Sequence, residues 1–118
     1  MGAVAETERS VDQPRVKVPA MVAKGEPFEV KVLVAHPMES GQRQDETSGA
    51  KVPRKILHSF VCSLGGQEIL RVTMYPAVSA NPYLSFYATA EHSGELVLVW
   101  TDDDGSQLRT TAHIEVGP

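Results

Sequence analysis

Cysteine is almost absent from this chain of 118 residues, in which Cys62 is the single example. One cysteine excludes a disulfide framework within the chain and by itself says nothing about the redox compartment. Long apolar runs are missing too, since no stretch approaches the roughly 20 residues that a membrane-spanning helix needs. We therefore expect no membrane insertion.

The chain has little excess charge of either sign, with a formal net charge of −4 and scattered basic residues. Phosphate binding needs a clustered basic face, so nucleic acid is not an expected partner. Residues 1–10 contain neither a basic segment nor a long apolar one, which predicts that the chain has no signal peptide. By its own sequence the chain is expected in the cytoplasm.

Motifs for catalysis and for metal binding are also missing. No nucleophile elbow or phosphate-binding loop is present, and the four histidines lack the spacing of a zinc site. A calcium loop starting at Asp102 fails, because Gln107 and His113 stand where glycine and a carboxylate are required. Residues 102–105 instead predict a hairpin turn with exposed carboxylates. We expect no catalytic residues, no metal site, no cofactor and no enzymatic activity.

What the chain does contain is the two-residue alternation of β-strands. It is clearest over residues 27–36, where Phe28, Val30, Val32 and Val34 share one face. Six further strands are predicted over residues 15–18, 55–64, 67–74, 83–90, 96–100 and 107–116. Gly65-Gly66 predicts a hairpin turn. The pattern indicates an all-β fold, an immunoglobulin-like antiparallel β-sandwich of about seven strands. This domain spans residues 14–118 and follows a flexible tail over residues 1–13.

Cys62 lies in the middle of the predicted strand over residues 55–64, on a face shared with Ile56, His58, Phe60 and Leu64. Free cysteine is among the most buried residue types, which favours a small core side chain. A reactive thiolate would need exposure and a positive neighbour. The alternatives of a nucleophile, a disulfide partner or a metal ligand stay open at this point.

Two loops carry residue types that are enriched in protein interfaces, namely residues 36–43 and 79–83. The candidate partner-binding residues in these loops are His36, Met38, Arg43, Asn81 and Tyr83. An alternative function is a stand-alone binding module that holds a small ligand or a soft metal at these loops, since His36 and Met38 offer an imidazole and a thioether.

Four motifs occur together and in order: His36-Pro-Met-Glu-Ser-Gly-Gln-Arg43, Pro53-Arg-Lys-Ile56, Ser79-Ala-Asn-Pro-Tyr83 and Trp100-Thr-Asp-Asp-Asp-Gly-Ser106. With them the sequence resembles the SoxZ family, over residues 14 to 116. The resemblance implies an immunoglobulin-like sandwich that pairs with a SoxY-like subunit. SoxY bears the intermediates of thiosulfate oxidation on a cysteine of its C-terminal arm.

The same resemblance implies that this chain is the non-carrying scaffold, with transient contacts to other Sox enzymes. It also changes the expected location to the periplasm, which the chain reaches together with a signal-bearing partner. In that setting Cys62 becomes a candidate for a disulfide between the subunits after export.

Overall fold

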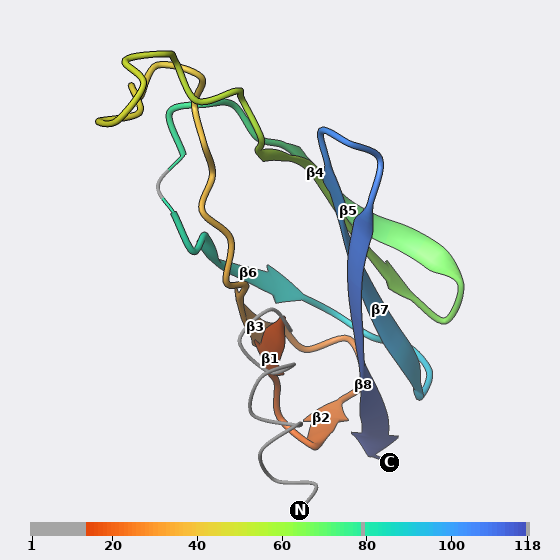
Figure 1. The fold of residues 1–118 in the computed structure, drawn as a ribbon. Coiled ribbons are helices and arrows are strands. Elements are labelled where there is room, and N and C mark those ends of the chain that lie inside the picture. Colours follow the sequence, from red (N-terminus) through yellow and green to blue (C-terminus); the bar gives the residue numbers. More distant parts are fainter. Residues whose placement is uncertain (1–13, 79, 118) are drawn as a thin grey trace, which may run out of the picture.

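The computed structural model describes residues 14–78 and 80–117, so the expected tail over residues 1–13 lies outside the described residues. The described residues form eight strands in two sheets, which pack face to face (Figure 1). The strands are β1 (Arg15–Lys17), β2 (Met21–Ala23), β3 (Phe28–Leu33), β4 (Leu57–Leu64), β5 (Gln67–Thr73), β6 (Tyr83–Ala88), β7 (Gly94–Asp102) and β8 (Gln107–Gly117). The predicted all-β sandwich is confirmed.

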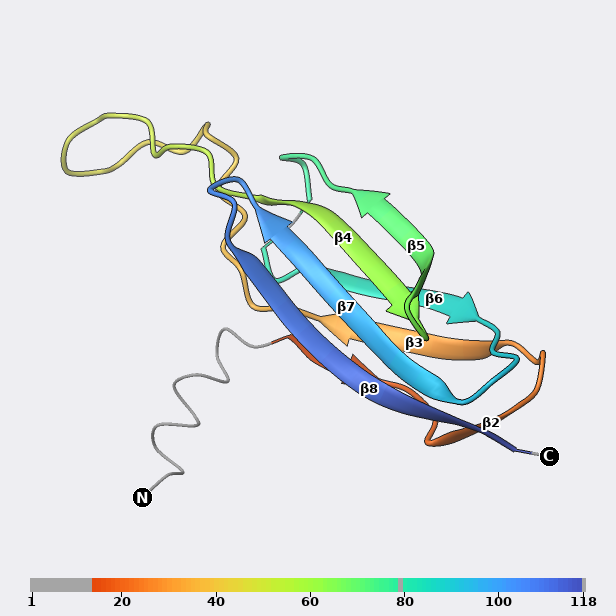
Figure 2. The same ribbon diagram turned by 90° about the vertical axis from the view of Figure 1, so that its right-hand side faces the viewer.

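The smaller sheet has the strand order β1-β3-β6 and the larger one β2-β8-β7-β4-β5 (Figure 2). Neighbouring strands are antiparallel with one exception, because β2 pairs in parallel with β8. Strand β2 was not predicted, because its pairing with β8 is long-range and its three residues, Met-Val-Ala, show no alternation of polar and apolar side chains. The chain passes from one sheet to the other at Pro19, between β1 and β2, and this crossing joins the two sheets along one side.

The core lies between the sheets and is built from the inward positions of alternating strands. Phe28, Val30, Val32 and Val34 are all buried, as predicted. On the larger sheet Trp100 packs against Phe60, with their ring centroids 4.8 Å apart. Burial of such large apolar side chains is the main favourable contribution to folding.

Simple alternation over residues 55–64 predicts Leu57 on the face opposite Ile56 and Cys62, and this prediction is wrong. The residue is buried, with 1% of its surface exposed. The register between β4 and β7 shifts between Leu57 and Ser59. This irregularity interrupts the simple alternation and lets Ile56 and Leu57 both face the core.

The hairpin predicted at Gly65-Gly66 connects β4 and β5. Both glycines have positive φ, 60° and 85°, as the favoured two-residue hairpin turn requires. Helices long and apolar enough to cross a membrane are absent from residues 14–78 and 80–117.

Candidate functional site

Three connections meet at one end of the sandwich, which we call the loop end: residues 34–56, residues 74–82 and the turn after Asp102. The first of them projects beyond the strands (Figure 1). Backbone hydrogen bonds tie the three together, from Asn81 N to the His36 carbonyl at 2.7 Å and from Asp103 N to the Ile56 carbonyl at 2.9 Å. The described parts of the three connections are therefore held together by backbone hydrogen bonds.

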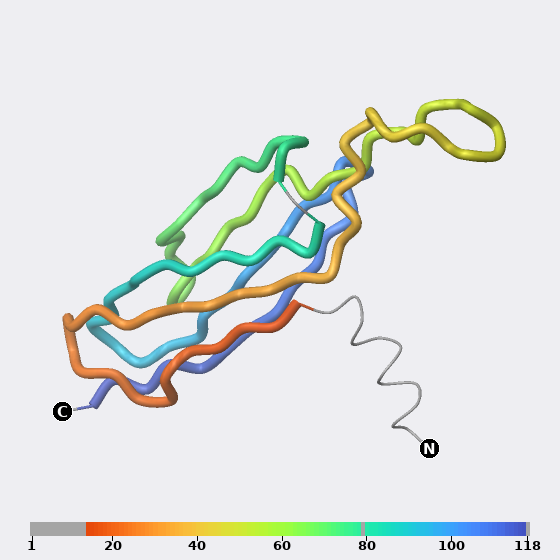
Figure 3. Tube along the Cα trace, turned by 90° about the vertical axis from the view of Figure 1, so that its left-hand side faces the viewer, coloured from red at the N-terminus to blue at the C-terminus, as the bar shows by residue number. Residues whose placement is uncertain are grey.

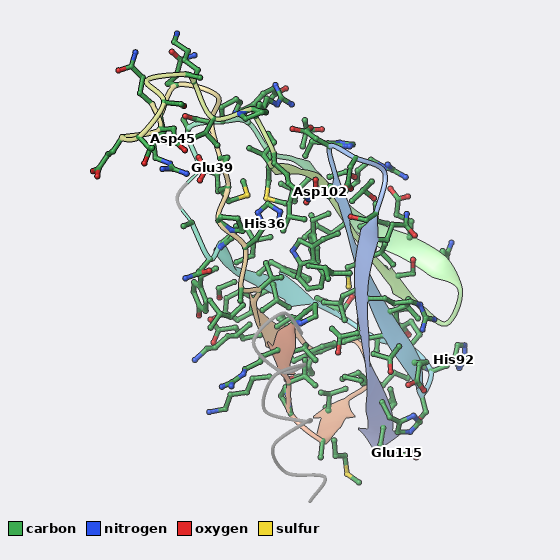
Figure 4. All side chains as sticks on the ribbon, in the orientation of Figure 1. His36, Glu39, Asp45, His92, Asp102 and Glu115 are labelled. Carbon is green, nitrogen blue, oxygen red and sulfur yellow. The ribbon has the colours of Figure 1, made fainter. Side chains whose placement is uncertain are left out.

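A buried histidine–aspartate pair lies at the centre of the loop end. His36 and Asp102 are 7% and 4% exposed, and the distance from His36 Nε2 to Asp102 Oδ2 is 2.6 Å. His36 continues the inward series of β3, and Asp102 continues the inward series Leu96, Leu98 and Trp100 of β7. The two side chains point toward one another between the sheets (Figure 4).

The hydrogen bonds of His36 define its tautomer. The backbone N–H of Met38 donates to His36 Nδ1 at 2.9 Å. Because a backbone amide can only donate, Nδ1 must carry the lone pair, and the ring proton is on Nε2. His36 is thus a neutral imidazole that donates to the carboxylate of Asp102.

Lys55 closes the pair toward solvent, with Nζ 2.7 Å from Asp102 Oδ2 and 3.3 Å from Asp104 Oδ2. Burial by itself raises the pKa of Asp102, but the hydrogen bonds from Lys55 and His36 outweigh it and hold this pKa below its usual range. The hydrogen bond to Asp102 correspondingly raises the pKa of Lys55. The buried negative charge of Asp102 is compensated by His36 on one side and by Lys55 on the other.

Asn81 connects the second loop to the first. Its Oδ1 accepts from the backbone N–H of His36 at 2.9 Å, while its own N–H donates to the His36 carbonyl. Asn81 has a φ of +54°, a left-handed conformation that asparagine tolerates better than most residues. The structure thus brings together the two candidate residues His36 and Asn81.

Met38 is buried as well, at 5% exposure, and its Sδ accepts a hydrogen bond from the backbone N–H of Leu57 at 3.3 Å. Its φ of +52° is uncommon for a residue other than glycine. The thioether and both ring nitrogens of His36 are therefore already engaged within the chain. No group of three or more potential metal ligands occurs within the described ranges. The geometry gives no support to the alternative of a soft-metal site at this pair.

Arg43 and Tyr83 are the candidate residues that face solvent. Arg43 is held by Glu39, with Nη2 2.8 Å from Oε2 at the base of the projecting loop. Tyr83 is 57% exposed and begins β6 on the outer face of the smaller sheet, directly opposite Leu33. A contact of these five residues with a partner stays a prediction, and His36, Met38 and Asn81 have structural roles within this chain.

A second charged contact at the loop end joins Arg54 and Asp103. Arg54 Nε lies 2.9 Å from Asp103 Oδ2, and the same oxygen accepts from the backbone N–H of Ile56. These hydrogen bonds lower the pKa of Asp103, the one from Arg54 most of all. Exposed contacts of this kind position the loop more than they stabilise the fold.

Cys62 is fully buried, with 0% of its surface exposed, between Leu70 and Leu98 of the neighbouring strands. Burial raises the pKa of its thiol to about 11. This burial gives no support to the expected disulfide between Cys62 and a partner, because the side chain has no exposed surface in this fold. The interpretation as a core side chain is confirmed.

Sequence reasoning missed Asp102 and Lys55. Asp102 was assigned to an exposed turn, and this is wrong, since it is 4% exposed, whereas the side chain of Asp104 in the same turn is 55% exposed. The signal was present, because extending the alternation of residues 96–100 by one step places residue 102 inward. Lys55 carried no such signal, as its partner is remote in sequence.

The described chain is an all-β sandwich, and polar contacts at its loop end hold the loops in position. Among curated proteins no sequence matches this chain. A superoxide reductase (neelaredoxin) variant from Ignicoccus hospitalis shares the fold, with 20% identity, a TM-score of 0.72 and coverage of 97% of this chain and 87% of that one. A putative superoxide reductase from Thermotoga maritima has 14% identity and a TM-score of 0.71, covering 94% and 90%.

The sulfur carrier protein SoxY from Chlorobium limicola f thiosulfatophilum also has this fold, with a TM-score of 0.63, 14% identity and coverage of 99% of this chain and 94% of that one. The model of the family described as sulphur oxidation protein SoxZ matches residues 16–113. The chain belongs to the SoxZ family. It is a subunit of a carrier complex of sulfur oxidation.

Proposed function

We propose that this chain is the scaffold subunit of a heterodimeric sulfur carrier. It pairs with a SoxY-like protein whose C-terminal arm cysteine bears the covalent intermediates of thiosulfate oxidation. Other Sox enzymes contact the pair transiently. The complex works in the periplasm, where the chain arrives together with its signal-bearing partner.

The burial of Cys62 is the observation that carries this proposal. It is the only cysteine of the chain, it is 0% exposed, and its thiol has a pKa near 11. A covalent carrier needs an accessible nucleophile, and a thiol with this pKa is almost wholly protonated at neutral pH. The sulfur-bearing group of the complex therefore belongs on the partner.

Co-expression with the SoxY-like subunit of the same organism tests the pairing. We expect both chains to elute together in size-exclusion chromatography, at equal amounts. A chain that stays monomeric beside that subunit would contradict the proposal.

Intact-mass analysis after turnover of thiosulfate tests which chain carries sulfur. We expect mass increments on the partner and none on this chain, and a Cys62→Ser variant should give the same distribution. An increment on this chain that disappears in the Cys62→Ser variant would show that the carrier thiol has been assigned to the wrong subunit.

A further inference from the structure

The outer face of the smaller sheet has an unusual composition for a chain of net negative charge. Alternation places Arg15 and Lys17 of β1 and Lys31 of β3 on this face, and all three are exposed. Within the described residues of β1, β3 and β6, Glu29 is the one carboxylate on this side, and it lies 3.8 Å from Lys31. The face is therefore basic (Figure 3 shows these strands from the outside).

The register of β1 and β3 sets two of these cations against each other. Lys17 lies directly opposite Lys31 in the antiparallel pair. Like charges at directly opposite positions destabilise a sheet. Folding alone gives no reason for this arrangement, and such local conflicts are characteristic of functional surfaces.

Beside the cations, exposed apolar and aromatic side chains line the face. The neighbouring cross-strand row contains Arg15, Leu33 and Tyr83, and Leu33 and Tyr83 are 41% and 57% exposed. A groove of about 440 Å³ runs between this row and the lysines. Arginine and tyrosine around an aliphatic side chain are the residue types that dominate binding energy in protein interfaces.

We infer that the outer face of β1, β3 and β6 is the docking surface for the carrier subunit. The matching surface on the partner has an apolar centre and carboxylates that neutralise Arg15, Lys17 and Lys31. Charge complementarity is the reason to assign a protein with an acidic surface to this face. The inference rests on the proposed function, because it takes the SoxY-like subunit as the occupant.

The outer face of the larger sheet is the natural comparison. It presents the half-buried Val97 and Val99 and the exposed cation Arg109, which lies opposite Val99. An Arg109→Glu variant therefore reverses one exposed strand cation, as Lys17→Glu does, but on the other side of the sandwich.

The substitution Lys17→Glu separates a binding role from a structural one. It converts the like-charge pair with Lys31 into an attractive pair, so we expect the thermal midpoint of the isolated chain to rise. In the same variant the dissociation constant for the carrier subunit, measured by titration calorimetry at low salt, should increase at least about tenfold. The difference from the wild type should shrink at high salt.

Leu33→Asp should also weaken binding, at low salt partly by repelling the carboxylates of the partner and at high salt by loss of the apolar contact, while Arg109→Glu should leave it unchanged. Wild-type affinity in both the Lys17→Glu and Leu33→Asp variants would overturn the inference and leave the proposed function standing. Loss of binding in Arg109→Glu alone would move the docking surface to the larger sheet. A wild-type chain that does not bind the carrier subunit at all would contradict the proposed function itself.

Discussion

The pair of His36 and Asp102 shows how two polar residues can be buried without loss of the fold. Every described buried side-chain polar atom has a hydrogen-bond partner, including those of this pair. A buried carboxylate is costly unless it is compensated, and here His36 and Lys55 both donate to it. We interpret the pair as the contact that holds the two sheets and two loops in a fixed relation.

Removing this carboxylate should therefore destabilise the chain. We expect Asp102→Ala to lower the free energy of unfolding by about 2–4 kcal/mol, because it leaves the Nε2–H of His36 without an acceptor. Urea unfolding followed by the fluorescence of Trp100 measures the change. Asp104→Asn, in the same turn but exposed and still able to accept a hydrogen bond from Ser106, is the control and should cost much less. Equal losses in the two variants would show that the buried pair has no special role.

The carboxylates of this turn also predict a dependence of stability on pH. Hydrogen bonds from Ser106 lower the pKa of Asp104 from 3.8 to about 2, and hydrogen bonds lower those of Asp102 and Asp103 as well. A carboxylate with a depressed pKa in the folded state stabilises the fold above its unfolded pKa and loses this effect as the pH falls.

The free energy of unfolding should thus decrease as the pH falls from about 4 to about 2, where these carboxylates become protonated. Urea unfolding across this range measures the slope. Asp104→Asn should reduce the slope, since it removes one titrating group while keeping an oxygen that can accept from Ser106. An unchanged slope would contradict the assignment of acid sensitivity to this turn.

Among the elements, strands were predicted best where one face is clearly buried. The seven expected segments correspond to β1 and β3 through β8, because a two-residue alternation shows directly which side chains face the core. The β2 strand was not predicted, because its parallel pairing with β8 is long-range. Leu57 was assigned to the wrong face, because the register between β4 and β7 shifts beside it. Tertiary pairing decides features of this kind, which leave no local pattern.

The hairpin between β4 and β5 allows a test of turn chemistry. Gly66 has a φ of +85°, and apart from its two chain neighbours no residue has an atom within 4 Å of the place a Cβ would take, so the cost of substitution there is conformational. We expect Gly66→Ala to lower the free energy of unfolding by about 1–2 kcal/mol.

Gly66→Asn is the matched control for this turn and should cost less, because asparagine adopts the left-handed conformation more readily. Urea unfolding of both variants gives the comparison. Equal stability of Gly66→Ala and the wild type would show that the turn takes another conformation.

At the scale of the whole molecule, the described residues 14–78 and 80–117 leave the outer face of the smaller sheet uncovered. A partner that binds only the folded chain stabilises it by mass action, about 2.7 kcal/mol at a concentration one hundred times the dissociation constant.

The proposed pairing therefore predicts slower hydrogen exchange at the most protected amides of this chain when the carrier subunit is added. Mass spectrometry resolves the two chains, and the Lys17→Glu variant should show a smaller effect at equal concentration. Unchanged exchange of the wild type at saturating carrier subunit would contradict a stabilising complex.

The sequence by itself determined the fold class, the core faces of most strands, the hairpin at Gly65-Gly66 and the family, because these depend on local alternation, turn residues and contiguous motifs. Only the tertiary structure decided that His36 meets Asp102, that Lys55 compensates the carboxylate, and that Cys62 has no exposed surface. Those facts depend on contacts between residues far apart in the chain, such as His36 and Asp102 with a sequence separation of 66. A local pattern can show that a side chain faces inward, but which partner it meets is settled by the packing of the two sheets.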